Sequence, residues 1–234
     1  MQQQNMYILN YRKETIGVLS NRMPFSLPFY NDLQERSLDD LSDTLTFEVP
    51  SNHEDSILLD TDKYILYPTL DNEFRLYKIQ QVTNIRSGGE YRKEIYAELS
   101  AQDDLIKDVV RPISFSSASL ADVLEAILSG TDWKVGNVDD FGLQDYEITD
   151  YPTKREAIND AVQAYGGEVE YEFNTVGTTV TDQLVSVYEQ IGQKTDKSFT
   201  YSKDMTEIQR IEDVSKLVTA MIGVGKSEND SAMQ

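Results

Sequence analysis

Apolar and polar residues alternate in short runs through the first hundred residues, and this pattern predicts β-strands. In residues 43–50, Leu45, Phe47 and Val49 alternate with polar side chains, which places the apolar ones on one face of a half-buried strand. Further strand-like runs occur at residues 6–11, 15–20, 62–68 and 73–102. Strands at this spacing, joined by short polar turns, predict a small antiparallel barrel or sandwich.

The clearest β-hairpin lies within residues 73–102. Ser87, Gly88 and Gly89 supply its turn, because glycine accepts the positive φ that tight hairpins require. Pro112 then interrupts the strand pattern, so the first predicted domain covers residues 1–111.

The pattern becomes helical after Pro112. Apolar residues at i, i+3, i+4, i+7 and i+8 predict an amphipathic helix that begins after Ser119 as N-cap and ends before Gly130. These apolar residues are Leu120, Val123, Leu124, Ile127 and Leu128. A second helix is predicted to begin at the capping box formed by Thr153 and Glu156. Trp133, the only tryptophan, lies between the two predicted helices in the sequence, and we expect its side chain to be buried in the core.

A strand with an acidic stripe follows the second helix. Three apolar residues alternate there with three glutamates: Val169, Tyr171 and Phe173 with Glu168, Glu170 and Glu172. The alternation predicts that the apolar residues pack inward and that the carboxylates lie outside. Two helices on a small sheet predict an α+β module at residues 112–180. The sequence of residues 181–234 predicts further strands. No segment after the last of them could pair with it, so we expect the chain to be part of a longer protein.

Charge and composition narrow the classes of function. The chain has 21 Lys and Arg against 41 Asp and Glu, a net charge of −20. This balance argues against nucleic-acid recognition, which needs cations to displace condensed counterions, but it leaves open an acidic conduit for DNA. The chain has no cysteine, which excludes disulfides and Cys-ligated zinc. No apolar stretch is long enough to predict a membrane span.

No catalytic, cofactor-binding or metal-binding residue is predicted. His53 is the only histidine, and its polar loop favours an ordinary loop residue over a catalytic one. The glutamates at 168, 170 and 172 place their oxygens in a row and not around an ion, which favours a solvated strand face or a subunit boundary over a Ca²⁺ site. The acidic pairs Asp103–Asp104 and Asp139–Asp140 lack the spacing of a calcium loop.

Five segments, taken in order, resemble the N-terminal region of siphophage tail-hub proteins, the family of tail-associated lysins and prophage endopeptidase tail proteins. The segments are residues 42–50, 77–106, 118–136, 154–174 and 199–225. The resemblance implies a fold similar to the baseplate hub of contractile phages, which is α+β and mostly β. It implies a tube-like antiparallel β-barrel at residues 1–111, an inserted α+β module at residues 112–180, and the incomplete start of a second barrel at residues 181–234.

The same resemblance implies a structural function. Three copies would form a homotrimeric ring at the tail tip of the virion, assembled in the host cytoplasm. The ring would continue the tail tube, attach to the distal tail protein and other tail-tip proteins, let DNA pass without specific binding, and carry C-terminal cell-wall or receptor-acting domains. Peptidoglycan hydrolysis would belong to such a C-terminal part, so this chain is not expected to be an enzyme.

Two alternative functions follow from the residues themselves. A cell-wall hydrolase, such as an endopeptidase, would require His53 or a pair of acids to be essential. A carbohydrate-binding adhesin would use tyrosines on strand faces, since aromatic rings can stack on sugars. The candidate tyrosines are Tyr64, Tyr67, Tyr77, Tyr91 and Tyr96.

Overall fold

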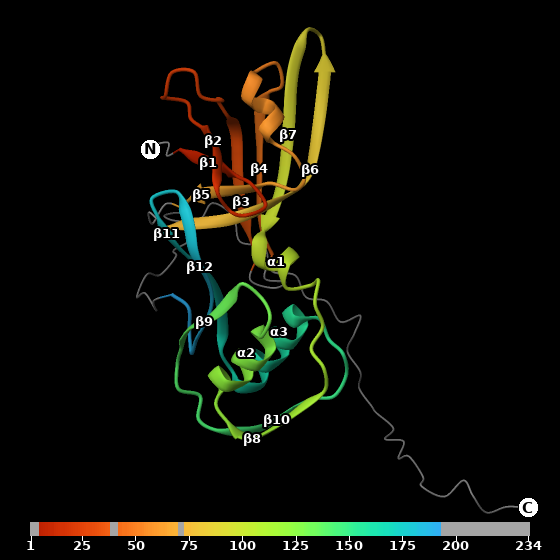
Figure 1. Cartoon of the computed structure of the whole chain (residues 1–234), viewed down its shortest axis with the longest axis vertical. Helices are drawn as coiled ribbons and strands as arrows, with labels where there is room; N and C mark the ends of the chain where they lie inside the picture. The colour runs from red at the N-terminus through yellow and green to blue at the C-terminus, as the bar shows by residue number, and fades with distance from the viewer. Residues whose placement is uncertain (1–4, 38–41, 70–72, 193–234) are drawn as a thin grey trace, which may run out of the picture. The chain divides into compact units, whose positions relative to one another are not determined.

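The N-terminal part of the chain folds into a seven-stranded antiparallel sheet (Figure 1). The computed structural model describes residues 5–37, 42–69 and 73–192. The strand order is β2-β1-β5-β6-β7-β4-β3. The strands are β1 (Met6–Leu9), β2 (Thr15–Leu19), β3 (Tyr30–Arg36), β4 (Asp43–Pro50), β5 (Tyr64–Pro68), β6 (Phe74–Ser87) and β7 (Glu90–Leu99). The prediction of a strand-rich N-terminal part is confirmed.

Alternation along β4 produces the burial that the sequence predicts. Leu45, Phe47 and Val49 are fully buried, and the residues between them are half-buried. The β6–β7 hairpin also follows the prediction, because Gly88 and Gly89 form its turn with φ of 59° and 88°. Side chains of β4 and β7 on the same face therefore build one continuous apolar layer beneath the sheet.

The sheet begins with β2 and ends with β3 among the described strands, and each of these pairs along its length with one neighbour only. An isolated parallel bridge joins Leu19, at the end of β2, to Leu27, which lies ahead of β3. Closure of this sheet into a barrel stays a prediction. The α+β, mostly β class is confirmed.

Two helices and two small sheets form the second part of the described chain. A 3₁₀ helix, η1 (Glu54–Leu58), and the short α1 (Ser100–Asp104) precede it. Its elements are β8 (Ile113–Ala118), α2 (Leu120–Leu128), β9 (Trp133–Val138), β10 (Gln144–Ile148), α3 (Lys154–Tyr165), β11 (Glu168–Val176) and β12 (Thr179–Tyr188). In Figure 1, α2 and α3 lie between the β8–β10 ribbon and the sheet of β11, β12 and β9, and each helix contacts both.

Local signals fix the ends of both helices. Ser119 caps α2, and Thr153 and Glu156 form a reciprocal capping box at the start of α3. Gly166 ends α3 in the left-handed conformation, with φ of 83°. The predicted core face of α2 is buried, and Trp133 is only 3% exposed. These predictions are confirmed.

The three-stranded sheet extends past residue 180, where the sequence placed the end of the module. β12 runs to Tyr188, pairs antiparallel with β11 and pairs parallel with β9. Residues 181–188 therefore belong to this sheet in the structure and are not available to begin a second barrel. The rest of the predicted second barrel, residues 193–234, lies outside the described residues.

Candidate functional site

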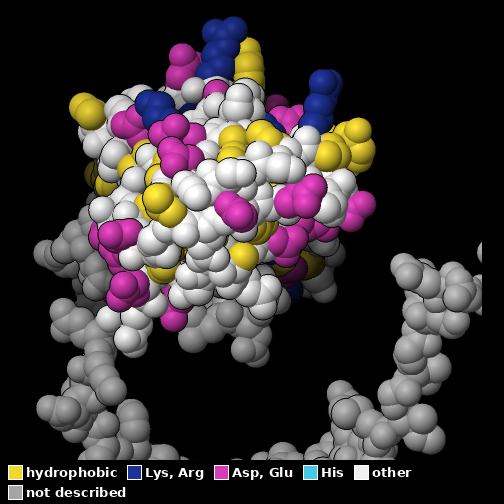
Figure 2. Space-filling model, turned by 90° about the horizontal axis from the view of Figure 1, so that it is seen from below, with side chains coloured by type: hydrophobic (Ala, Val, Ile, Leu, Met, Phe, Trp, Pro, Cys, Tyr) yellow, Lys and Arg dark blue, Asp and Glu magenta, His cyan; other side chains and the backbone are white. Residues whose placement is uncertain are grey.

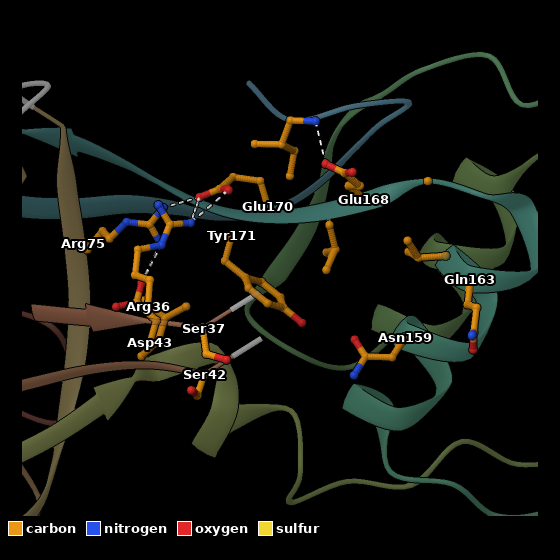
Figure 3. Close-up of a pocket in the computed structure, with 15 residues that line it drawn as sticks. Arg36, Ser37, Ser42, Asp43, Arg75, Asn159, Gln163, Glu168, Glu170 and Tyr171 are labelled. Carbon is orange, nitrogen blue, oxygen red and sulfur yellow. Dashed lines mark hydrogen bonds and ion pairs between the residues drawn. The ribbon is translucent and has the colours of Figure 1, made fainter. Parts of the chain in front are cut away.

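A half-open cavity of about 700 Å³ lies where the seven-stranded sheet meets α3 and β11 (Figure 3). Arg36, Asp43 and Arg75 line it from the sheet. Asn159 and Gln163 line it from α3, which lies on the other side in Figure 3. The cavity therefore combines charged groups from one part of the chain with polar and apolar groups from another.

Two cations and two carboxylates form an ion-pair network at one end of the cavity. Arg75 Nη1 lies 2.9 Å from Asp43 Oδ2, and Arg75 Nη2 donates to Glu170 Oε1. Arg36 Nη2 lies 3.1 Å from the same Glu170 oxygen. The side chains of Arg75, Asp43 and Glu170 are 8%, 5% and 16% exposed, so they need each other to offset the loss of hydration.

Tyr77 and Gln34 satisfy the remaining oxygen of Asp43. The Tyr77 hydroxyl donates to Asp43 Oδ1 at 2.7 Å, and Gln34 Nε2 donates to the Tyr77 oxygen at 2.7 Å. Burial, followed by the charge of Asp43, raises the pKa of Tyr77 strongly. Burial alone would lower the pKa of Arg75, but Glu170 and Asp43 outweigh it and raise that pKa. Arg75 therefore keeps its charge and Tyr77 stays neutral over the physiological range.

The acidic stripe is mostly a set of structural hydrogen-bond acceptors. Glu168 Oε2 accepts from the backbone N–H of Ile191 at 2.7 Å. Glu172 accepts from Ser186 Oγ and from the Tyr188 hydroxyl at 2.9 and 2.7 Å. The prediction that all three carboxylates lie outside is wrong for Glu170, because arginines of the opposing sheet draw it into the ion-pair network.

The sequence of β6 indicates one member of this network, the buried cation Arg75. Arg75 shares a strand face with Tyr77 and Ile79 at i, i+2 and i+4, and all three residues are buried. A cation in an apolar row must have a buried anionic partner, because an unpaired charge is too costly to bury. The signal does not identify that partner, because Glu170 is 95 residues away along the chain.

The other candidate residues have local structural roles. His53 caps η1, and its Nδ1 accepts from the backbone N–H of Asp55 at 3.2 Å. Asp103 pairs with Lys78 and Lys107. Asp104 accepts from Trp133 Nε1 at 3.4 Å.

The acidic pair at residues 139 and 140 also accepts backbone hydrogen bonds. Asp139 Oδ2 accepts from Glu189 N at 2.9 Å, and Asp140 Oδ1 accepts from Gly142 N at 3.0 Å. Within residues 5–37, 42–69 and 73–192, no three His, Asp or Glu side chains gather in a way that could hold a metal ion. No helix in this part of the chain is long and apolar enough to cross a membrane.

The candidate tyrosines do not share one exposed platform. Tyr64 and Tyr77 are buried in the sheet, and Tyr67 packs edge-on against Tyr77 with ring centroids 6.2 Å apart. Tyr91 is 49% exposed, and the Arg86 guanidinium lies over its ring. Rings buried in the core offer no free face for stacking on a sugar.

Buried tyrosines predict a loss of stability at alkaline pH. Burial raises the pKa of Tyr64 and of Tyr171, each to about 12, whereas unfolded tyrosines ionise near pH 10. The stability that these groups contribute is complete below about pH 10 and falls between about pH 10 and 12, because the unfolded chain releases their protons first. Urea midpoints measured across this range should decrease with pH, and Tyr64→Phe should decrease less steeply. A midpoint that stays constant across this range would contradict the prediction.

Comparison with known proteins shows what this architecture is similar to. Residues 107–181 match the family model described as the prophage endopeptidase tail domain, which confirms the resemblance over that segment. No protein of curated function matches the chain in sequence.

Two solved tail proteins share the fold. Prophage tail protein gp18 from Listeria monocytogenes EGD-e has a TM-score of 0.56 at 15% identity, over 87% of this chain and 57% of that protein. The tail protein from Neisseria meningitidis MC58 has a TM-score of 0.52 at 12% identity, over 78% of this chain and 49% of that protein. The chain thus spans about half the length of these structures.

Proposed function

We propose that this chain is a structural component of a phage tail, the hub of its tail tip. The observation that carries the proposal is the coincidence of two findings on one chain. Residues 107–181 match the prophage endopeptidase tail domain, and a fold shared with phage tail proteins extends over most of the chain.

The proposed hub is a homotrimeric ring that continues the tail tube and attaches to the distal tail protein. Strands β2 and β3 support pairing between copies, because each has only one neighbouring strand among the described residues. An edge strand offers unpaired backbone N–H and C=O groups to another chain. DNA would pass through the ring, and the net charge of −20 supports passage without adhesion. Cell-wall or receptor-acting domains would lie beyond this part of the protein.

We propose a non-enzymatic role for the described residues. This proposal is supported by the use of His53 as a helix cap and of the Asp and Glu candidates as acceptors for backbone and cationic donors. These hydrogen bonds and ion pairs give each candidate residue a structural role in the fold. A peptidoglycan hydrolysis assay on the chain should therefore give no activity above buffer.

Light scattering across a concentration series, with negative-stain imaging of the main peak, tests the hub. We expect trimers that image as rings about as wide as a tail tube, either from the chain alone or after addition of the distal tail protein. A chain that stays monomeric with that partner in excess contradicts the proposal and directs attention to the adhesin alternative. Glycan binding by the monomer would then be the measurement that decides.

A further inference from the structure

The loop between β2 and β3, residues 20–29, is held rigidly and is named here the Phe25 loop. The Ser26 hydroxyl donates to two backbone carbonyls of this loop, at 2.7 and 3.0 Å. Asn21 both donates to and accepts from the backbone of Phe29, at 2.7 and 3.0 Å. Side chains thus take the place of regular secondary structure, and they fix the loop before any partner binds.

The tip of the loop presents a large apolar side chain to solvent. Phe25 is 95% exposed, and the neighbouring Met23 is 49% exposed. Phe25 also has φ of 64°, a left-handed conformation that is unusual for a bulky residue. Strained residues that surrounding structure holds in place concentrate at binding sites. Exposed aromatic side chains on ordered loops have the properties of interface anchors.

The cavity beside the ion-pair network has the lining and the volume to accept such a ring. Its apolar lining includes Leu99, Val162 and Tyr171, and its volume of about 700 Å³ exceeds that of a phenyl group. Asn159 Oδ1, which also lines the cavity, is buried and has no hydrogen-bond partner among the described residues. Asn159 is thus a polar group that the described residues leave unsatisfied, and the fit of the ring rests on the apolar lining alone.

The Phe25 loop and the cavity carry side chains of opposite charge. Arg22 is the only charged residue of the Phe25 loop, whereas the exposed Glu168 lines the cavity. Residues 112–192 contain three Lys and Arg against fifteen Asp and Glu, a net charge of −12. Figure 2, which views the molecule from below, shows acidic side chains spread across that face with few Lys or Arg. Arg22 therefore meets a local attraction at Glu168, at a cavity whose lining holds three carboxylates and two guanidinium groups.

We propose that the Phe25 loop of one copy inserts into the cavity of a second copy. Phe25 occupies the apolar part, and Arg22 lies toward Glu168. Because Phe25 is exposed in its own chain, the cavity that it fills belongs to another molecule. Such a contact joins two different surfaces, and it closes into a ring when the rotation between copies allows closure. The contact rests on the proposed homotrimer and specifies where its copies touch.

Engineered cysteines test the contact directly, because the chain has none of its own. Phe25→Cys is mixed with a differently tagged Gln163→Cys, whose side chain lies at the cavity, and the mixture is oxidised. We expect a disulfide-linked pair that carries both tags. The matched control replaces Phe25→Cys by Ile57→Cys, which is 80% exposed on η1, and should give only background crosslinking. Equal yields from the two mixtures would overturn the proposed contact.

A second variant measures the contribution of the ring. Phe25→Gly removes the side chain and accepts the left-handed φ, so the loop keeps its conformation. Light scattering should show self-association weakened by about thirtyfold, the effect of losing one anchor residue. Ile57→Ala should change nothing. Trimers that form equally well with Phe25→Gly overturn this contact and leave the proposed hub standing.

Docking of the loop on a different protein would give a different set of results in these experiments. The loop docks elsewhere if the wild-type chain remains monomeric, the two cysteine variants give no mixed disulfide, and another tail protein binds through Phe25. That result overturns contact between copies. The hub itself is then judged by the separate assembly experiment with the distal tail protein.

Discussion

Replacing Arg75 with methionine will destabilise the chain by about 3–5 kcal/mol, because it leaves two nearly buried carboxylates without the cation that they share. Asp43 and Glu170 are 5% and 16% exposed in their side chains, so water cannot replace the guanidinium. Arg36 stays near both carboxylates but is 52% exposed, and its charge is screened. Urea unfolding followed by the fluorescence of Trp133, the only tryptophan, measures the loss.

The matched control is Arg36→Met, which removes a cation of the same network from a half-exposed position. We expect a loss below about 1 kcal/mol, typical of an exposed ion pair. A triple variant, with Arg75→Met, Asp43→Leu and Glu170→Leu, should recover much of the stability, because no buried charge is then left unpaired. Equal losses for the two arginine variants would show that burial does not determine the strength of this network.

Local patterns in the sequence account for most of the fold. The alternation of Leu45, Phe47 and Val49 predicted which face of β4 is buried, and capping residues predicted where α2 and α3 begin. These signals are reliable because backbone hydrogen bonding and side-chain periodicity depend on residues within a few positions of each other. The end of the module near residue 180 has no such signal, because β12 continues without a break to Tyr188.

The candidate site was harder to predict because its parts come from distant segments. Glu170 reads as a solvent-facing residue within β11, and only its contact with Arg75 and Arg36 makes it part of a buried network. The exposure of Phe25 could not be predicted from the sequence either, since the conformation of its loop depends on hydrogen bonds between loop side chains and backbone. In both cases, long-range packing or irregular loop geometry determined the result, and neither leaves a periodic signal.

The ion-pair network and the Phe25 loop have different places in the proposed assembly. The network joins the seven-stranded sheet to β11 at one end of the cavity, so it fixes the shape of that end. A fixed cavity lowers the entropic cost of accepting an anchor side chain from another copy. Loss of Arg75 should therefore weaken association between copies as well as stability.

Replacing Trp133 with alanine will also remove about 3–5 kcal/mol of stability, through a cavity in the core of the three-stranded sheet. The indole packs edge-on against Tyr171 and Phe173, with ring centroids 5.6 and 5.5 Å apart. Both neighbours belong to β11, so they cannot relax into the space without disturbing that strand. Because this variant lacks the fluorescent reporter, urea unfolding should be followed by far-ultraviolet circular dichroism.

Trp133→Phe separates packing from hydrogen bonding at this position. It keeps an aromatic ring against Tyr171 but removes the indole N–H that donates to Asp104 Oδ2 at 3.4 Å. We expect a loss of about 1 kcal/mol for the hydrogen bond, in addition to a small packing defect. A phenylalanine variant as unstable as the alanine variant would instead place the main role of Trp133 in its link to α1, which contains Asp104. The aromatic cluster would then be secondary to that link in holding β9 against the rest of the chain.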